Sequence, residues 1–421
     1  MNHRLHPEPA GSTPAGRDIL PLSGVRIVDL SQIGAGPYGT SLLGDLGADV
    51  IKVEPIHGDS FRYVDNAYAP GESAYFYGVN RSKRSVALNL KDPEGYRTLM
   101  RLVKEADVFV IAFRPDAVQR MGLDFETLSA VNDRLIYASI TAFGETGPRA
   151  TQPGMDILAQ ALSGMMGVTG EVGGGPVKVG VPIADFVGSF FLGFGVTAAL
   201  RQRDQTGRGD KLTINLLDGQ IAAFANYVTA YDKTKVPFRP QGGGHPQLVP
   251  YQPFLGSDGR YFILACLNDR FWNALLPFLQ EFGDFEDPRF ESNSGRVEHR
   301  VELCSRLEEI FATQPAEYWI SRLEEAGVPC SSIHRFEEAL EDPQVVANES
   351  ITELEHPRFG TYKVPNNPLR FERAATGPRG YAPGLGEHTN EVLLETGLSQ
   401  TEIDDLVQRG IINPALVSAV G

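Results

Sequence analysis

Residues 24–54 read GVRIVDLSQIGAGPYGTSLLGDLGADVIKVE, and they carry the clearest indication of the fold of the chain. The apolar run at 25–30 predicts a buried strand, residues 31–36 a glycine-containing turn, the residues after the turn a helix, and residues 48–54 a second strand. A strand, a helix and a strand in this order are typical of a βαβ unit.

The same alternation continues along the chain. Apolar runs at 85–90, 108–113 and 135–140 predict strands, and residues 92–106 predict a helix with Pro93 near its start. Residues 177–185 are strand-like and 186–203 have helical length, which would place Asp185 at a strand-to-helix junction. The sequence therefore predicts an α/β protein with a mostly parallel sheet covered by helices.

A second, smaller α+β domain is expected in the middle of the chain. Residues 233–250 are rich in glycine and proline, residues 251–265 predict a hairpin turning at 257–259, and helical patterns cover 270–326. We place a flexible tail at 1–20, a large domain at 21–205 and 345–421, the small domain at 225–330, and linkers at 206–224 and 331–344.

Composition narrows the class of protein. The chain has 421 residues, 42% apolar and 22% charged, with a net charge of −15, so nucleic acid is an unexpected partner. The apolar run at 186–200 contains four interrupting Gly and Ser residues and is shorter than a bilayer span, so we expect a buried helix and no membrane. Three separated cysteines and no spaced histidine pair predict neither disulfides nor a metal, and we expect a cytoplasmic protein.

The turn at residues 34–39 fits the G-x-G-x-x-G fingerprint, and Glu54 ends the next strand. This spacing is typical of dinucleotide binding and predicts a nicotinamide enzyme. Glycines at a helix N-terminus also allow close approach of other anionic ligands, and they are common in purely structural turns. The fingerprint by itself leaves these interpretations open.

Several polar residues have both a functional and a structural explanation. Asp185 before an apolar helix is typical of an N-cap, but the same place would present an ionised carboxylate as a nucleophile. Asp156 is either another cap or a second active-site carboxylate. Three cations near predicted strand ends are either phosphate ligands or ordinary surface charges: Lys91, Arg114 and Arg120. Three consecutive glycines form either a hairpin connector or a mobile lid: Gly242, Gly243 and Gly244.

Seven short motifs occur in an order that resembles the formyl-CoA transferase family, the class III or CaiB/BaiF-type CoA-transferases. They are GAGP at 34–37, LGADVIKVE at 46–54, NRSKRS at 80–85, FRP at 113–115, AD at 184–185, TGRG at 206–209 and LGEHT at 385–389. The resemblance covers nearly the whole chain after the tail. It implies a Rossmann-like large domain built from both chain ends, a smaller domain between them, and an interlocked homodimer.

The resemblance also implies a reaction and a site. Asp185 matches the family's catalytic aspartate, which transfers CoA from an acyl-CoA donor to a carboxylic acid through covalent aspartyl intermediates, with no tightly bound cofactor. The glycine loop at 242–244 would shield those intermediates from water. CoA would contact the residues that match the family's binding positions: Gly34, Ala35, Leu88, Asn89, Lys91, Ala112, Phe113, Arg114, Arg120 and Met155.

Departures from the family's pattern bear on the substrate. Ala112, Pro153, Met155 and Asp156 stand where oxalate-type members often carry Asn, Lys, Tyr and Glu, which puts a formyl or oxalyl substrate in doubt. The related α-methylacyl-CoA racemases have a His before the second acid, where this chain has Met155. Methionine cannot act as a base, so CoA transfer is the leading hypothesis and racemisation the alternative.

Overall fold

The computed structural model describes residues 20–69 and 72–413, which divide into two compact units. The first unit contains residues up to 163, then 180–225 and those from 344 onward; the second contains 164–179 and 226–343. Apart from Leu20, the tail expected at 1–20 lies outside the described residues. Each unit is described by itself below.

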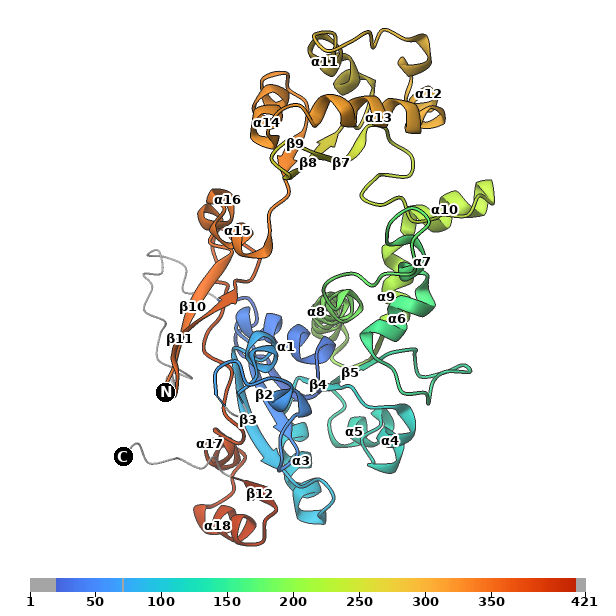
Figure 1. Cartoon of the computed structure of the whole chain (residues 1–421). Coiled ribbons are helices and arrows are strands. Elements are labelled where there is room, and N and C mark those ends of the chain that lie inside the picture. Colours follow the sequence, from blue (N-terminus) through green and yellow to red (C-terminus); the bar gives the residue numbers. More distant parts are fainter. Residues whose placement is uncertain (1–19, 70–71, 414–421) are drawn as a thin grey trace. The chain divides into compact units, whose positions relative to one another are not determined.

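A seven-stranded sheet forms the centre of the first unit, in the order β12-β3-β2-β1-β4-β5-β6 (Figure 1). Six strands pair in parallel, and β12 is antiparallel to β3. The strands are β1 Arg26–Leu30, β2 Asp49–Glu54, β3 Lys83–Leu88, β4 Val108–Ile111, β5 Ile136–Thr141, β6 Lys211–Asn215 and β12 Ile412–Asn413. The prediction of a mostly parallel sheet is confirmed, and β1 and β4 form its topological switch point.

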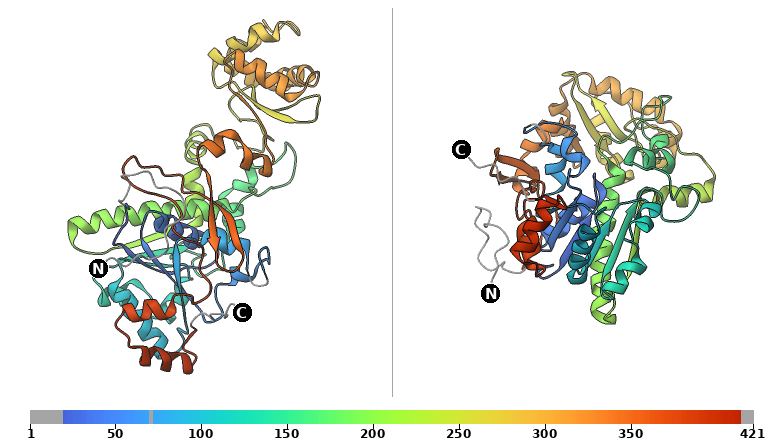
Figure 2. Two further views of the ribbon diagram at one scale, coloured as in Figure 1. Left: turned by 90° about the vertical axis from the view of Figure 1, so that its left-hand side faces the viewer. Right: turned by 90° about the horizontal axis from the view of Figure 1, so that it is seen from below.

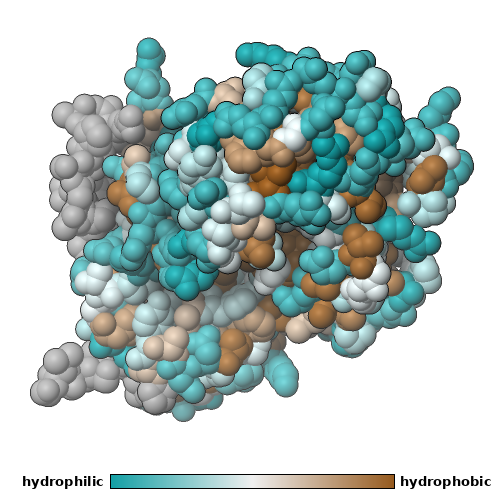
Figure 3. Space-filling view, turned by 45° about the horizontal axis from the view of Figure 1, so that its top comes forward, coloured by the Kyte–Doolittle hydropathy of each residue, from teal (hydrophilic) through white to brown (hydrophobic). Residues whose placement is uncertain are grey.

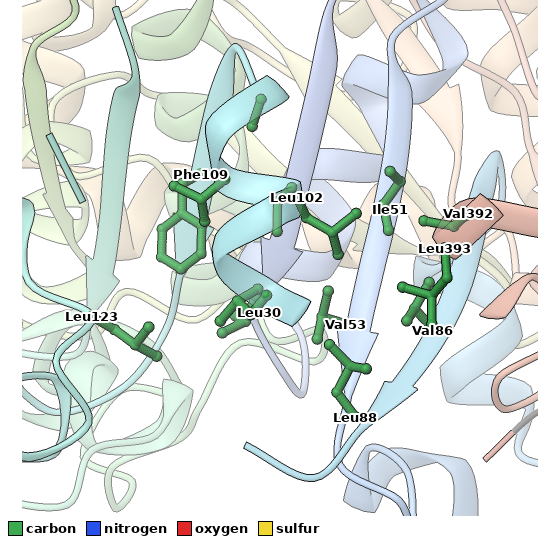
Figure 4. Packing of buried hydrophobic residues seen from close by; sticks show 14 of the residues in the cluster. Leu30, Ile51, Val53, Val86, Leu88, Leu102, Phe109, Leu123, Val392 and Leu393 are labelled. Atoms are coloured by element: carbon green, nitrogen blue, oxygen red, sulfur yellow. The ribbon is translucent and has the colours of Figure 1, made fainter. Parts of the chain in front are cut away.

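Five helices cover one face of this sheet. They are α3 Pro93–Glu105, α4 Pro115–Arg120, α5 Phe125–Val131, α17 Thr389–Glu395 and α18 Gln400–Gln408. Alternate strand residues such as Val28, Leu30 and Ile51 pack under α3, and Val392 and Leu393 of α17 pack next to β3 (Figure 4). The C-terminal helices thus complete a core begun by the N-terminal strands, as the views in Figure 2 show.

The other face of the sheet is covered by α1 Ala35–Asp45 and α8 Ile183–Thr206, with α6 Asp156–Ser163 and α9 Leu216–Ala223 beside α8. The residues that alternate with those of the first face, such as Ile27, Val50 and Val110, point into this second core. Because the sheet is buried on both sides, successive apolar residues of a strand such as β4, Val-Phe-Val-Ile, enter opposite cores.

Helix α8 is buried on one side only, which corrects the expectation of a buried helix. By length and composition it could cross a membrane, and 39% of its most apolar window is buried. The side toward the sheet contributes Leu192 and Val196 to the core, whereas Phe190 and Phe194 are exposed. On the face shown in Figure 3, apolar side chains form separate brown areas among hydrophilic residues.

The first unit also contains an unpredicted hairpin, formed by β10 Ile351–His356 and β11 Gly360–Pro365. Its side chains pack with Phe76 and Tyr77 of α2 Ala74–Val79, which follows the 3₁₀ turn η1 Ser60–Tyr63. The surrounding stretch is rich in proline, which masked the strand pattern. The short helix α16, Pro343–Ala347, precedes the hairpin.

The second unit is built on a three-stranded antiparallel sheet of β7 Tyr251–Leu255, β8 Tyr261–Ala265 and β9 Cys330–Ser332. The predicted hairpin is confirmed as β7 and β8. Trp272 and Trp319 lie in the core between sheet and helices. The helices are α7 Met165–Val168, α10 Ala225–Thr234, α11 Asp269–Leu279, α12 Asn293–Glu298, α13 Arg300–Phe311, α14 Ala316–Glu325 and α15 Phe336–Glu341, with the 3₁₀ turn η2 Pro288–Phe290.

Three sequence-based boundaries differ from the structure. Residues 177–182 belong to none of the strands in the described part of the chain, and α8 begins already at Ile183, so Asp185 is not at a strand-to-helix junction. The expected linker at 206–224 contains β6 and α9, and that at 331–344 contains α15. Apolar alternation alone produced the false strand, because it indicates which side chains can be buried and not whether the segment joins a sheet.

Candidate active site

A small pocket of about 130 Å³ lies at the switch point of the sheet. Its walls are the turn after β1, the residues after β4, the end of β5 and the first residues of α6 and α8. In open α/β sheets ligands bind at this place because the loops after β1 and β4 diverge and leave a crevice. Eight sequence-predicted residues line it: Gly34, Ala35, Ala112, Phe113, Arg114, Met155, Asp156 and Asp185.

Asp185 is the third residue of α8, and only 8% of it is exposed. Its carboxylate lies against Gly34: a Cβ atom added to that glycine would come within 2.5 Å of Asp185 Oδ2. Burial, and secondly the negative charge of Asp156, raise the pKa of Asp185 to about 7. A carboxyl group with this pKa is partly ionised at neutral pH, and because it is buried, its ionised form is poorly solvated.

Asp156, not Asp185, caps helix α8. Its Oδ1 accepts the backbone N–H of Ala184 at 2.7 Å and that of Asp185 at 3.3 Å, and its Oδ2 accepts a bond from Gln160 at 2.7 Å. The N-cap expectation for Asp185 is therefore wrong, because the cap comes from another helix. The Asp185 carboxylate therefore does not cap the helix, and Asp185 lines the pocket.

The contact between α1 and α8 places Asp185 beside the turn. Gly39 permits it, since a Cβ there would meet Leu192 Cδ2 at 2.8 Å and the Ser189 carbonyl oxygen at 3.0 Å. Ser189 Oγ donates to the Ala35 carbonyl at 2.7 Å and so ties α8 to the first turn of α1. A small residue on α1 and a hydroxyl on α8 thereby fix the distance between Gly34 and Asp185.

Sequence reasoning missed Tyr75, whose hydroxyl lies 3.0 Å from the Cβ that Gly34 would carry. Burial, with the nearby charges of Asp185 and Asp156, raises the pKa of Tyr75 to about 12. Its phenol is therefore protonated at neutral pH and faces two carboxylates. No local pattern around Tyr75 pointed to the site, because the contact depends on the packing of α2 against the turn.

A larger pocket of about 940 Å³ lies beyond the ends of β2 and β3. Leu88, Asn89, Lys91 and Arg120 of the predicted set line it, and Gln32 and Phe113 line both pockets. Arg120 pairs with Asp116 at 2.7 Å, whereas Lys91 forms no ion pair within the described part of the chain. His57 and Arg97, which the sequence did not single out, also line this pocket, and Arg97 pairs with Glu94.

Glu54 does not fit the role that the dinucleotide fingerprint assigns to it. Its carboxylate accepts bonds from Arg62 at 2.7 and 2.8 Å, from the Asp59 N–H at 3.0 Å and from Ser85 Oγ at 2.7 Å. An acidic residue that holds a ribose must offer free acceptor oxygens to it. The occupied carboxylate argues against a nicotinamide dinucleotide at this turn.

Gly242, Gly243 and Gly244 belong to the second unit. Gly242 has a φ of 60° and donates its N–H to the Gly170 carbonyl, and a Cβ on Gly243 would collide with Pro253. A tight turn thus explains two of the glycines structurally. Their expected role as a shield for reaction intermediates stays a prediction.

Comparison with known proteins gives a consistent result over nearly the whole chain. The model of CoA-transferase family III matches residues 22–389. A succinate–glutarate CoA-transferase of Agrobacterium fabrum is 37% identical over 89% of this chain and 95% of its own length. The acetyl-CoA:oxalate CoA-transferase of Acetobacter aceti is 36% identical over 83% of this chain and 89% of its own length.

Among solved structures, a CAIB/BAIF family protein from Brucella suis superposes with a TM-score of 0.80 at 36% identity, covering 89% of this chain and 99% of its own. The family resemblance seen in the motifs is thereby confirmed. The chain belongs to CoA-transferase family III and is a CoA-transferase.

Proposed function

We propose that this enzyme transfers CoA from an acyl-CoA to a carboxylic acid through covalent intermediates on Asp185. The observation that carries the proposal is the Asp185 carboxylate itself, which lies buried in the small pocket against Gly34. A carboxylate that caps no helix, pairs with no cation among the described residues and lines a pocket is available as a nucleophile.

The proposed reaction exchanges one activated carboxyl group for another. Asp185 attacks the donor thioester, the C–S bond breaks, and a mixed anhydride and the CoA thiolate form. The thiolate then attacks the Asp185 carbonyl, which releases the donor acid and leaves an aspartyl-CoA thioester. The acceptor carboxylate attacks the aspartyl-CoA thioester and forms a second mixed anhydride and the CoA thiolate. The thiolate then attacks the acyl carbon of the acceptor, which releases the Asp185 carboxylate and the new acyl-CoA. Every step conserves an activated acyl bond, so no outside energy source is needed.

The electrostatics of the small pocket support this role. Poor solvation raises the reactivity of the Asp185 carboxylate, and the protonated Tyr75 hydroxyl nearby is a hydrogen-bond donor for an oxygen that gains charge. Arg114 is the only cation among the described residues that line this pocket, and its Nη1 donates to the Thr151 carbonyl. It offers a charge to a substrate carboxylate or phosphate.

We place the nucleotide part of CoA in the larger pocket. Its volume suits a nucleotide, and Lys91 is a cation with no ion pair among the described residues. Gln32 and Phe113 line both pockets, so the pantetheine arm would pass between them to reach Asp185. The predicted contacts at Leu88, Asn89 and Arg120 fit this placement.

The proposal also covers assembly and location. We propose that the enzyme forms a homodimer, and that it acts in the cytoplasm without binding a membrane. A continuous group of helices exposes apolar side chains that a single chain leaves uncovered: Phe190, Phe191 and Phe194 on α8, Ile157, Leu158 and Leu162 on α6, and Ile221 on α9. We call this the α8 face. Burying it against a second copy would explain an apolar helix that is half-exposed.

The decisive experiment combines a substrate screen with trapping of the intermediate. Succinyl-, acetyl- and formyl-CoA are offered with glutarate, oxalate, succinate and other acids, and the CoA esters formed are identified by mass spectrometry. During turnover, hydroxylamine should yield a hydroxamate on Asp185. Asp185→Asn should bind CoA in calorimetry but form neither product nor adduct. Transfer that survives in Asp185→Asn would refute the covalent route.

The racemase alternative makes a separate prediction. No described residue that lines the small pocket is a histidine, and Met155 occupies the place of the second base. A racemase would still exchange the α-proton of a 2-methylacyl-CoA with deuterium from heavy water in the absence of any acceptor acid. We expect no such exchange.

A further inference from the structure

The turn between β1 and α1 contains a strained residue directly before Gly34. Ile33 has a φ of 72°, in the left-handed region that β-branched residues rarely adopt. Gln32, Ile33 and Gly34 all line the small pocket. Backbone strain of this kind persists only where the surroundings enforce it. Whatever holds Ile33 in this conformation therefore also holds the wall against which Asp185 lies.

A buried ion pair contacts the peptide groups on both sides of Gln32. Lys52 Nζ donates to the Ser31 carbonyl at 2.9 Å and to Asp59 Oδ2 at 3.0 Å. The same Asp59 oxygen accepts the N–H of Ile33 at 3.3 Å. Both side chains are 0% exposed. The pair thus connects the end of β2 to the strained part of the turn.

Further bonds fix the position of this pair. Asp59 Oδ1 accepts the N–H of Phe61 at 3.0 Å, and its own N–H donates to Glu54. Ser31 is held from its other side by Asp29, which in turn pairs with Lys83 at 3.0 Å. Residues 31–33 therefore lie between two buried ion pairs.

The charges are better explained by orientation than by stability. A buried ion pair adds little net stability compared with apolar residues of the same volume, because both charges must leave water. Apolar residues, however, could not bond the Ser31 carbonyl or the Ile33 N–H. Charge-assisted bonds are the stronger kind and are suited to holding a strained peptide.

We propose that Lys52 and Asp59 are positioning residues for CoA transfer: they hold residues 31–34 so that Gly34 stays against the Asp185 carboxylate. They act through the turn and touch no substrate. This inference rests on the proposed function of Asp185. It also accounts for the exclusion of water from that carboxylate, since an open turn would expose it.

The test replaces the pair by neutral residues of similar size, Lys52→Met with Asp59→Asn. The matched control is Arg81→Met with Asp45→Asn, since that pair is also 0% exposed but bonds neither to residues 31–34 nor to a residue that lines either pocket. We expect kcat to fall by about 10²-fold in the test variant, because small misplacements of reacting groups have effects of this size, and to stay at the wild-type value in the control.

Two further measurements distinguish a positioning role of the pair from a general loss of stability in the variant. The acidic limb of the pH profile of kcat/KM should move to lower pH in the test variant, because water that reaches Asp185 lowers its pKa. The loss of kcat should also be smaller when Ile33→Gly is present, since glycine adopts a positive φ without strain. Should the double variant not fold, Asp59→Asn is compared with Asp45→Asn in the same way.

The outcomes are distinct. If the wild-type enzyme transfers CoA between none of the donors and acceptors in the screen, the proposed function is wrong. That result would not bear on the positioning role of Lys52 and Asp59. If the wild type is active and the test variant retains its kcat and pH profile, the inference is wrong. Equal losses of kcat in test and control variants would also overturn it, since they would indicate loss of stability alone.

Discussion

At the scale of single residues, the environment of Asp185 couples activity to pH. Its carboxylate must be ionised to attack, and its pKa is raised to about 7 by burial and by Asp156. We expect kcat/KM to rise with pH through about 7 and then to level off where no other group titrates. An ordinary exposed aspartate, with a pKa of about 3.9, would already be about nine-tenths ionised at pH 5.

Asp156→Asn should shift this profile. The amide keeps an oxygen that can cap α8, but the negative charge that opposes ionisation of Asp185 is lost, so the acidic limb should move to lower pH. Asp218→Asn on α9 is the control, because Asp218 does not contribute to the pKa of Asp185. An unchanged limb in Asp156→Asn would show that burial alone sets the pKa.

Asp185→Asn should stabilise the protein more at high pH than at low pH. The pKa of Asp185 is higher in the folded than in the unfolded state, so its contribution to stability is complete below about pH 4 and is lost as the pH rises through about 7. Asparagine never ionises. The rise in Tm of the variant over wild type should therefore be larger at pH 8 than at pH 5, and an equal rise at both would contradict the assigned pKa.

The candidate residues themselves differ in how far the sequence predicted them. Asp185 and Asp156 were singled out from their places beside apolar helices and from the family motifs. Their division of tasks was not, because the hydrogen bonds from Ala184 and Asp185 to Asp156 join two separate helices. Tyr75 and the Lys52–Asp59 pair lie in stretches whose local pattern predicts only helix, strand or turn.

At the scale of elements, the contact between α1 and α8 decides where the nucleophile lies. Gly39→Ala should push the helices apart, since the new Cβ would meet Leu192 and the Ser189 backbone. We expect a loss of about 1–3 kcal/mol in stability and a fall in kcat, measured by denaturant unfolding and steady-state kinetics.

Gly78→Ala in α2 is the control for this change. A Cβ at Gly78 meets no atom within 4 Å, and alanine favours a helix over glycine by about 1 kcal/mol, so stability should stay equal or rise. If Gly39→Ala behaves like Gly78→Ala in both measurements, close packing of α1 and α8 does not position Asp185.

At the scale of the whole molecule, the α8 face predicts the assembly. Phe194 on α8 is 72% exposed, the largest exposed fraction among the residues named for this face, so Phe194→Glu would place a charge in the proposed dimer contact. Light scattering should give twice the mass of one chain for the wild type and a single chain for the variant. Val131→Glu on α5, on the other side of the sheet, should leave the mass unchanged. A wild type of single-chain mass would refute the dimer.

The periodicity and turn residues of the sequence predicted the strands β1 to β5, the mostly parallel sheet and the β7–β8 hairpin, and the order of the short motifs indicated the family. These features depend on neighbours along the chain, and the local pattern records them. The tertiary structure was needed to show which strands α17 and α18 cover, that Asp156 caps α8, and that Gly34 lies against Asp185. Those contacts join residues far apart in sequence, and they arise from the packing of whole elements, which no local pattern contains.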